Sequence, residues 1–272
     1  MTSLQGDTGF HLGADISTEL DRAVRGGELR LVYQPEVHLR TRTVVAVEAL
    51  LRWQHPSRGL LEPSGFIAVA EQSSAINEVG AWVIDEGVRE LASWLTALPD
   101  LSVTLRVNVS PLQLAQDAIV SVFADALERH GVSGQCVCAE ITERVPRDLA
   151  RLAATLPRLR ALGIRSAIDD FGLGYSGLSQ LRALPVDLIK IDRSLVAGIA
   201  ADERARTILR AMVDLAGDLG IAVTAEGVES EPDARALDKL GCEYAQGHLL
   251  GAPVPGADIL ELLRARGART SA

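Results

Sequence analysis

This chain of 272 residues lacks the long apolar segments of membrane proteins and has only three cysteines. No uninterrupted apolar run reaches the ~18 residues that a membrane helix needs. The first fourteen residues contain no basic region followed by an apolar stretch, as a secretory signal would. Cys136 and Cys138 alternate along an apparent strand and Cys242 is distant, which favours buried reduced thiols over a disulfide or a soft-metal site. We therefore expect a soluble, cytoplasmic protein without membrane contact.

Clusters of lysine and arginine are also absent. The net charge is −9, which argues against a surface that follows the phosphates of polymeric nucleic acid. An anionic ligand would therefore need metal ions or a few basic side chains close to it to neutralise its charge. The five histidines form no spaced cluster and are interpreted as structural or surface groups. The three tryptophans are expected in the core rather than on a platform that stacks bases.

Short apolar or β-branched runs alternate with longer amphipathic stretches along the whole chain. We expect strands at Arg30–His38, Val44–Leu51, Leu105–Ser110, Val137–Thr142, Ile164–Asp169, Leu188–Asp192, Ala222–Gly227 and Tyr244–Leu250. We expect helices at Ser17–Arg25, Pro63–Glu71, Gly80–Leu98, Pro111–His130, Asp148–Leu162, Glu203–Leu219, Pro232–Leu240 and Gly256–Arg264. Eight strands in a chain near the roughly 250 residues of a TIM barrel predict an α/β protein with a (β/α)8 barrel.

One connection departs from this alternation. Only Leu39–Thr43 joins the first two predicted strands, and a parallel crossover needs about a dozen residues or more. The first two strands should therefore form an antiparallel hairpin, which makes the fold a modified TIM barrel. No interdomain linker is evident. We expect a flexible N-terminal segment over residues 1–14, one barrel domain over 15–264 and a flexible tail over 265–272.

Nearly every predicted strand contains or ends in a polar side chain, although carboxylates disfavour burial. These side chains are Glu48, Asn108, Glu140, Asp169, Asp170, Lys190, Glu226 and Gln246. Any one of them alone could be a capping or salt-bridging group. Because the strands of a parallel barrel end at the same face, we expect the whole set to converge on one pocket.

The chemistry of this set narrows the choice of metal. Its donors are carboxylate and amide oxygens without histidine or cysteine, which favours Mg²⁺ or Mn²⁺ over zinc or copper. Five carboxylates would repel one another unless cations neutralise them. Asp169 and Asp170 could bridge two ions ~3.5–4 Å apart, the spacing of two-metal phosphodiester cleavage. Lys190 could orient the attacking water, help to deprotonate it, or neutralise the transition state; its alternative is a salt bridge within the acid ring.

At these residues the sequence resembles the EAL phosphodiesterase family, over roughly Ile16 to Pro255. The matching segments are Tyr33-Gln34-Pro35, VEALLRW with Glu48, RVNVS with Asn108, EITE from Glu140, DDFGLGYSGL from Asp169, LPVDLIKIDRSLV with Lys190, AEGVE with Glu226 and YAQG with Gln246. A three-letter string has no weight alone, whereas eight ordered segments at compatible spacing are specific. The resemblance implies cleavage of cyclic di-GMP to linear pGpG by a water activated by two ions of Mg²⁺ or Mn²⁺.

The resemblance also implies roles for single residues. It assigns Glu48, Asn108, Glu140 and Asp169 to one ion, and Asp169, Asp170 and Glu226 to the other. It places Lys190 and Gln246 beside the nucleophilic water. It also implies a catalytic set that consists of Lys190, Glu48, Gln246 and Glu143. It assigns Gln34 to a guanine contact, Leu50 to the nucleotide floor, Arg52 to a substrate phosphate and Asp192 to substrate binding. Arg52 could instead be a surface residue, and Asp192 and Glu229 could orient metal ligands.

Two departures from the family pattern bear on activity. Glu143 resembles the glutamate that anchors the loop after Asp169 and Asp170, and in this loop Leu173 and Gly177 replace a common threonine and serine. His248 and Ala252 stand where an aromatic and a basic residue are common at the rim of the guanine pocket. These departures favour a weak or inactive cyclic di-GMP receptor as the alternative to an active enzyme, whereas the complete ligand set favours the enzyme.

A third hypothesis, a pure protein-interaction domain, predicts neither nucleotide nor metal affinity. The resemblance further implies a homodimer. It also allows for a sensory or cyclase domain upstream of this chain in a longer protein.

Overall fold

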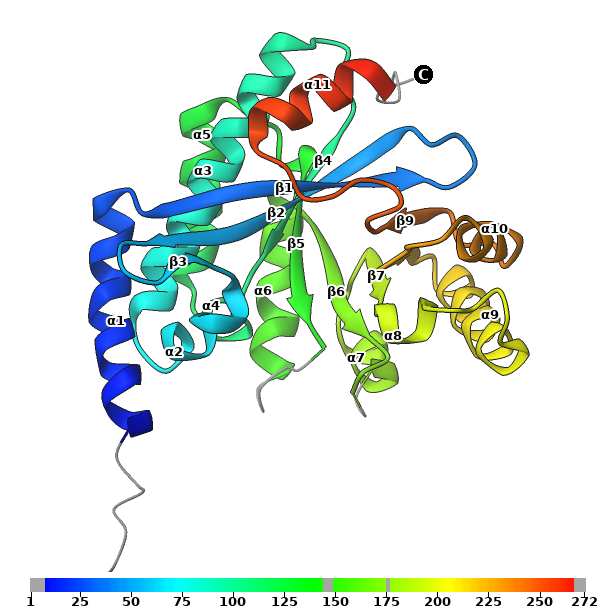
Figure 1. Cartoon of the computed structure of the whole chain (residues 1–272), viewed down its shortest axis with the longest axis horizontal. Coiled ribbons are helices and arrows are strands. Elements are labelled where there is room, and N and C mark those ends of the chain that lie inside the picture. Colours follow the sequence, from blue (N-terminus) through cyan, green and yellow to red (C-terminus); the bar gives the residue numbers. More distant parts are fainter. Residues whose placement is uncertain (1–7, 144–148, 175–176, 267–272) are drawn as a thin grey trace, which may run out of the picture.

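A computed structural model describes residues 8–143, 149–174 and 177–266 of the chain. Strands occupy the centre, with α1 and α3 on one side and α9 and α10 on the other (Figure 1). The strands are β1 (Leu29–His38), β2 (Val44–His55), β3 (Gly59–Leu61), β4 (Thr104–Asn108), β5 (Val137–Thr142), β6 (Arg165–Phe171), β7 (Leu188–Ile191), β8 (Ala222–Ala225) and β9 (Tyr244–Gln246).

Helices of varied length connect these strands. They are α1 (Thr8–Gly26), α2 (Ile67–Glu71), α3 (Ala75–Ala97), α4 (Pro111–Leu114), α5 (Ala118–His130), α6 (Leu149–Ala161), α7 (Gly177–Ala183), α8 (Arg193–Val196), α9 (Glu203–Asp218), α10 (Glu231–Lys239) and α11 (Gly256–Arg266). Short 3₁₀ turns lie at Pro63–Gly65 and Gly134–Cys136. No helix within the described residues is long and apolar enough to cross a membrane.

The sheet closes into a barrel of eight strands. Its order is β1-β9-β8-β7-β6-β5-β4-β2, and pairing of β1 with β2 closes it, while β3 extends β2 outside the ring. β1 runs antiparallel to both β2 and β9, whereas the other neighbours in the ring are parallel. The predicted modified TIM barrel with an antiparallel first hairpin is confirmed. Because β1 is reversed, its earlier residues, rather than its later ones, lie toward the mouth where the parallel strands end.

Differences from the predicted elements are confined to boundaries and short segments. The strand predicted at Val137–Thr142 has the predicted bounds. The helix expected over Pro111–His130 is two helices, because α4 ends at Leu114 and α5 begins at Ala118. The short elements β3, α7 and α8 were not predicted. Helix α1 begins at Thr8 and α11 extends to Arg266, so the described ends of the segments expected to be flexible are helical.

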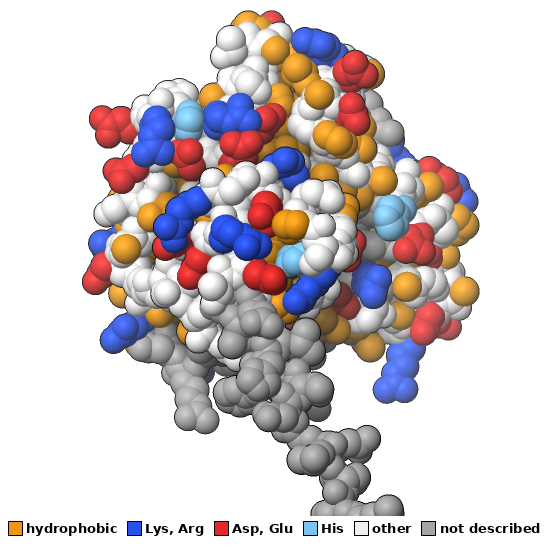
Figure 2. All heavy atoms as spheres, turned by 60° about the vertical axis from the view of Figure 1, so that its left-hand side comes forward, with side chains coloured by type: hydrophobic (Ala, Val, Ile, Leu, Met, Phe, Trp, Pro, Cys, Tyr) orange, Lys and Arg blue, Asp and Glu red, His pale blue; other side chains and the backbone are white. Residues whose placement is uncertain are grey.

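Aromatic and sulfur-containing side chains pack as predicted. Trp53 and Trp94 are buried in the core, and the ring of Trp94 meets that of Tyr33 edge to face, with centroids 4.8 Å apart. All three cysteines are free, and burial raises the pKa of Cys138 and of Cys242 to about 12, as for inert thiols. On the face shown in Figure 2, basic and acidic side chains are intermingled rather than separated by sign.

Candidate active site

The polar residues singled out in the sequence lie where the parallel strands end. Asn108 on β4 is in register with Glu140 on β5, and Asp169 on β6 is in register with Thr142, two residues beyond Glu140 on β5. Strand β4 stops at Asn108 because the capping box of α4 begins two residues later. The mouth of the barrel is therefore built by strand ends whose last inward side chains are charged or amide groups.

Lys190 lies at the centre of this set and is completely buried. Its Nζ is 2.8 Å from Glu226 Oε1, 2.9 Å from Glu48 Oε2, 3.0 Å from Glu140 Oε2 and 3.3 Å from Asp169 Oδ1. One ammonium thus faces four carboxylates from four strands or their ends. This geometry is the salt bridge within the acid ring that was the alternative interpretation of Lys190. A role for Lys190 at the attacking water stays a prediction.

The carboxylates fall into two overlapping groups. Glu48, Glu140 and Asp169 each offer an oxygen within 4.8 Å of the others, and so do Asp169, Asp170 and Glu226. Asp169 belongs to both groups. Two groups of oxygen donors that share one carboxylate match the arrangement that holds two hard divalent ions side by side.

Two amides complete the ring. Asn108 Nδ2 donates to Glu48 Oε1 at 2.7 Å, which leaves the carbonyl oxygen of Asn108 for another partner. Gln246 Nε2 donates to Glu48 Oε2 at 2.8 Å and to Gln34 Oε1 at 3.0 Å. Glu48 is thereby fixed by amides on both sides and by Lys190. The structure brings together all of the predicted ligands, together with Lys190 and Gln246.

Crowding of carboxylates shifts their protonation. Burial alone would raise the pKa of Glu48, but the charge of Lys190 and the hydrogen bonds from Lys190, Gln246 and Asn108 together lower it. Burial raises the pKa of Glu140 well above its usual range. Burial, with repulsion from Asp169 and Glu48, raises the pKa of Glu226 to about 8 against the attraction of Lys190. Burial opposes the charge of Lys190, but its four carboxylate partners raise its pKa, so it stays protonated.

Backbone strain marks the end of β6. Asp170 adopts a positive φ of 56°, which is uncommon for a residue with a side chain. Pairing of β6 with β7 shifts register between Ile168 and Phe171, across the two aspartates. This local irregularity places consecutive side chains, Asp169 and Asp170, in the same donor group, although successive residues of a regular strand point to opposite faces.

Glu143 holds the loop that follows. Its Oε2 accepts hydrogen bonds from the backbone N–H groups of Gly172 and Gly174, each at 2.9 Å, and it is almost fully buried. A Cβ on Gly174 would lie 2.6 Å from Glu143 Oε1, so the close contact between the loop backbone and Glu143 favours glycine at this position. The expected anchoring of the loop by Glu143 is therefore seen. Leu173 is 47% exposed, and the loop residues Tyr175 and Ser176 lie outside the described residues.

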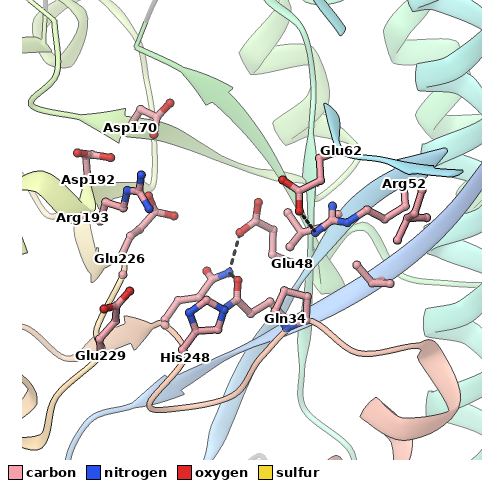
Figure 3. Close-up of a pocket in the computed structure, with 17 residues that line it drawn as sticks. Gln34, Glu48, Arg52, Glu62, Asp170, Asp192, Arg193, Glu226, Glu229 and His248 are labelled. Atoms are coloured by element: carbon pink, nitrogen blue, oxygen red, sulfur yellow. Dashed lines mark hydrogen bonds and ion pairs between the residues drawn. The ribbon is translucent and has the colours of Figure 1, made fainter. Parts of the chain in front are cut away.

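A pocket of about 630 Å³ opens above the acid ring. In Figure 3, Asp170, Glu226, Asp192 and Arg193 lie on one side of it and Gln34, Arg52 and Glu62 on the other, with Glu48 between them. Leu50 lines it as well. The four residues predicted to contact substrate, Gln34, Leu50, Arg52 and Asp192, all face this pocket.

Two predicted substrate residues also have structural partners. Arg52 lies 4.0 Å from Glu62 and donates to the carbonyl of Leu51 at 2.8 Å. Its side chain is 14% exposed, so it is not a freely solvated surface arginine. Asp192 Oδ1 accepts from the Ser194 N–H at 2.8 Å and so begins α8, while the residue still lines the pocket.

Sequence reasoning overlooked several residues around this site. Arg193 lines the pocket and was not singled out in the sequence, whereas His248 lines it as expected for a residue at the rim of the guanine pocket and is more than a structural or surface group. Below the acid ring, Arg106 NH2 donates to Glu36 Oε1 at 2.6 Å, and both residues are buried. A signal was present for this pair, because each is a charged residue inside a predicted apolar strand.

A family model described as the EAL domain matches residues 17–253. The chain belongs to the EAL domain family. An uncharacterized protein of Mycobacterium tuberculosis is 44% identical over 253 residues, which cover 93% of this chain and 41% of that protein. MucR of Pseudomonas aeruginosa, named a bifunctional diguanylate cyclase/cyclic di-GMP phosphodiesterase, is 38% identical over 89% of this chain and 35% of its own length.

Solved structures of EAL proteins superpose closely on the barrel. The phosphodiesterase of MucR in complex with c-di-GMP has a TM-score of 0.83 and 37% identity, covering 90% of this chain and 99% of that one. The EAL enzyme Bd1971 with cAMP and cyclic di-GMP bound has a TM-score of 0.89 and 33% identity, covering 95% of this chain and 70% of that one. This chain spans about two fifths of the length of the M. tuberculosis relative.

Proposed function

We propose that this EAL domain hydrolyses cyclic di-GMP to linear pGpG with two bound ions of Mg²⁺ or Mn²⁺, as a cyclic-guanylate-specific phosphodiesterase. The observation that carries the proposal is the pair of donor groups that share Asp169 at the barrel mouth. Membership of the family and the cyclic di-GMP complexes among its relatives support the substrate.

The charge of the acid ring supports bound divalent cations. Four carboxylates, from Glu48, Glu140, Asp169 and Glu226, share the ammonium of Lys190. When all four are ionised, their negative charge exceeds that of this ammonium, and divalent ions would offset it. The donors fit hard cations, because they are carboxylate and amide oxygens.

Each donor then has a defined task. Glu48, Asn108, Glu140 and Asp169 would hold one ion, and Asp169, Asp170 and Glu226 would hold the other. When bound, the ions would supply a water of lowered pKa and charge stabilisation at the scissile phosphate. The amide of Asn108 is oriented for metal binding. Its nitrogen donates to Glu48, which leaves its carbonyl oxygen, the atom that can bind a metal ion, for the ion.

The remaining residues orient the reactants. Lys190 and Gln246 both donate to Glu48 Oε2, so they converge on one point of the acid ring and can direct a water there. On the pocket wall, Arg52 offers its guanidinium to a phosphate, for which its planar fork of donors is suited. Gln34, Leu50 and Asp192 bound the space for the guanine bases. Glu143 holds the loop after Asp170 and so keeps the ligands in place.

Product analysis tests this proposal. Purified protein with Mg²⁺ or Mn²⁺ should convert cyclic di-GMP to pGpG, as separated by liquid chromatography, and EDTA should stop the reaction. Glu48→Gln keeps the size of the side chain but removes a ligand charge and should abolish turnover. Glu90→Gln on the outer helix α3 is the matched control and should turn over normally.

The same assay separates the competing functions. Tight binding of cyclic di-GMP without product in either metal would establish the receptor, which the exposed Leu173 and the rim residue His248 favour. Absence of both nucleotide and metal affinity in calorimetric titration would establish a pure interaction domain. Near-normal activity of Glu48→Gln would contradict the ligand assignment.

We also propose that the chain works as a homodimer within a longer cytoplasmic signalling protein. Exposed apolar residues support a dimer: Leu178 on α7 is 68% exposed, and Ile208, Leu215 and Leu219 lie along one face of α9 or just beyond it. The partial coverage of the relatives supports an upstream sensory or cyclase domain. Sedimentation of the wild type and of a double variant, Leu178→Asp with Ile208→Asp, tests the dimer. A monomeric wild type would contradict it.

A further inference from the structure

Beneath the acid ring lies a layer of buried charge that the proposed chemistry does not use. Glu36 on β1 is completely buried, and Arg106 on β4 is 6% exposed. Arg106 NH2 donates to Glu36 Oε1 at 2.6 Å, and Arg106 Nε lies 3.6 Å from Glu140 Oε1. The arginine therefore stands between two glutamates, one of which is a proposed metal ligand.

The register of the strands explains this layer. Arg106 precedes Asn108 by two residues, so both point into the barrel and Arg106 lies one step deeper. Glu36 follows Gln34 by two residues on the reversed strand β1, which also places it one step deeper than the mouth. Neither Arg106 nor Glu36 lines the substrate pocket.

Energetics argue against a purely structural role for this pair. Moving two charges out of water costs several kcal/mol per ion, and well-packed apolar residues at such positions are often as stable or more stable. Three atoms of the trio, Glu36 Oε2, Arg106 Nε and Glu140 Oε1, are buried without a hydrogen bond. Two of these atoms, Arg106 Nε and Glu140 Oε1, face each other at 3.6 Å, so the arginine lies against the proposed metal ligand as well as against Glu36.

We infer that Arg106, held by Glu36, is a positioning residue that fixes Glu140 for the first metal ion. The two oxygens of Glu140 are divided between two cations. Oε2 faces Lys190 at 3.0 Å in the acid ring, and Oε1 faces Arg106 below it. Arg106 fixes the carboxylate from beneath, so that Oε2 is presented to the ion. Its charge also offsets part of the repulsion among the ring carboxylates.

This inference rests on the proposed two-metal function but concerns a different property, the affinity for the ion. The diagnostic variant is Glu36→Leu with Arg106→Met, which removes both charges and keeps buried volume. Because no buried charge is left without its partner in the pair, the double variant should fold, and thermal unfolding in EDTA checks that it does. Arg106→Met alone leaves Glu36 unpaired, so its stability should fall below that of the double variant.

The measurement is Mn²⁺ affinity, read from the electron paramagnetic resonance signal of free Mn²⁺ without substrate. The double variant should bind the ions 10–100-fold more weakly than the wild type, as is typical when an outer partner of a metal ligand is lost. At saturating Mn²⁺ its KM for cyclic di-GMP should be unchanged, because neither residue reaches the pocket. Arg106→Lys, which keeps the charge, should recover part of the affinity.

Thr155→Val on α6 is the matched control, because it removes a buried hydrogen bond from Thr155 to the Leu114 carbonyl on α4, away from the ring. It should lower stability and leave Mn²⁺ affinity unchanged. A double variant that binds Mn²⁺ as tightly as the wild type would overturn the positioning role and leave the proposed function intact. A wild type that binds no Mn²⁺ would overturn both.

Discussion

Metal binding at this site should be coupled to proton release. Burial, with repulsion from Asp169 and Glu48, raises the pKa of Glu226 to about 8, so below that pH the metal-free site retains a proton on this ligand. An incoming ion must displace it. At pH 6, two units below this pKa, about 1% of Glu226 is ionised, which corresponds to roughly 100-fold weaker binding, or about 2.7 kcal/mol.

The assay is calorimetric titration of Mg²⁺ or Mn²⁺ at pH 6, 7 and 8, in buffers with different enthalpies of ionisation. Through Glu226 alone, affinity should rise about tenfold per pH unit and level off above about pH 8, and Glu226 should release close to one proton at pH 6. Glu140, whose pKa is also raised by burial, can add to the slope. Glu226→Gln should bind more weakly and lose the slope that Glu226 contributes.

The stability of the metal-free protein should show the same linkage. A carboxyl pKa raised from 4.5 to about 8 means that the folded state holds the Glu226 proton more tightly than the unfolded state. Its contribution is fully present below about pH 4.5 and is lost as the pH rises through about 8. Unfolding in EDTA should therefore become easier across this range. Metal affinity that does not vary with pH, without proton release, would refute the reasoning.

Three substitutions test other parts of the site. Lys190→Met should destabilise the metal-free protein by about 3–5 kcal/mol in denaturant unfolding, because it leaves a buried carboxylate cluster without its shared cation; unchanged stability would contradict this. Arg52→Ala should raise KM for cyclic di-GMP roughly 10–150-fold, the loss of a charged hydrogen bond worth about 1.5–3 kcal/mol, while Mn²⁺ affinity stays constant. Gly177→Ala should lower stability by about 1–3 kcal/mol, because its Cβ would lie 2.8 Å from the Phe171 ring, whereas Gly217→Ala, with open space around it, should not.

The barrel and its acid ring could be predicted because both depend on repeated local patterns. Alternation of strands and helices predicts a parallel sheet, and the short Leu39–Thr43 connection excludes a parallel crossover between the first two strands. Parallel strands end at one face, so polar residues far apart in sequence were expected together, and Asn108 and Glu140 are indeed level. Helices as short as α8, with four residues, have no period to detect, and β3 has only three residues.

The features that escaped prediction depend on partners across the barrel. Nothing near Glu36 in sequence reveals Arg106, which is 70 residues away and on a strand that is not its neighbour in the sheet. Arg193 reaches the pocket as the first residue of the short helix α8, whose position an apolar pattern does not define. The positive φ of Asp170, which brings it beside Asp169, is likewise a consequence of the assembled strand end.

Anomalous diffraction from crystals grown with Mn²⁺ and cyclic di-GMP tests the central claim most directly. We predict two manganese peaks about 3.5–4 Å apart, bridged by Asp169, with Glu48, Asn108 and Glu140 on one ion and Asp170 and Glu226 on the other. A single peak, or ions bound away from these side chains, would contradict the account.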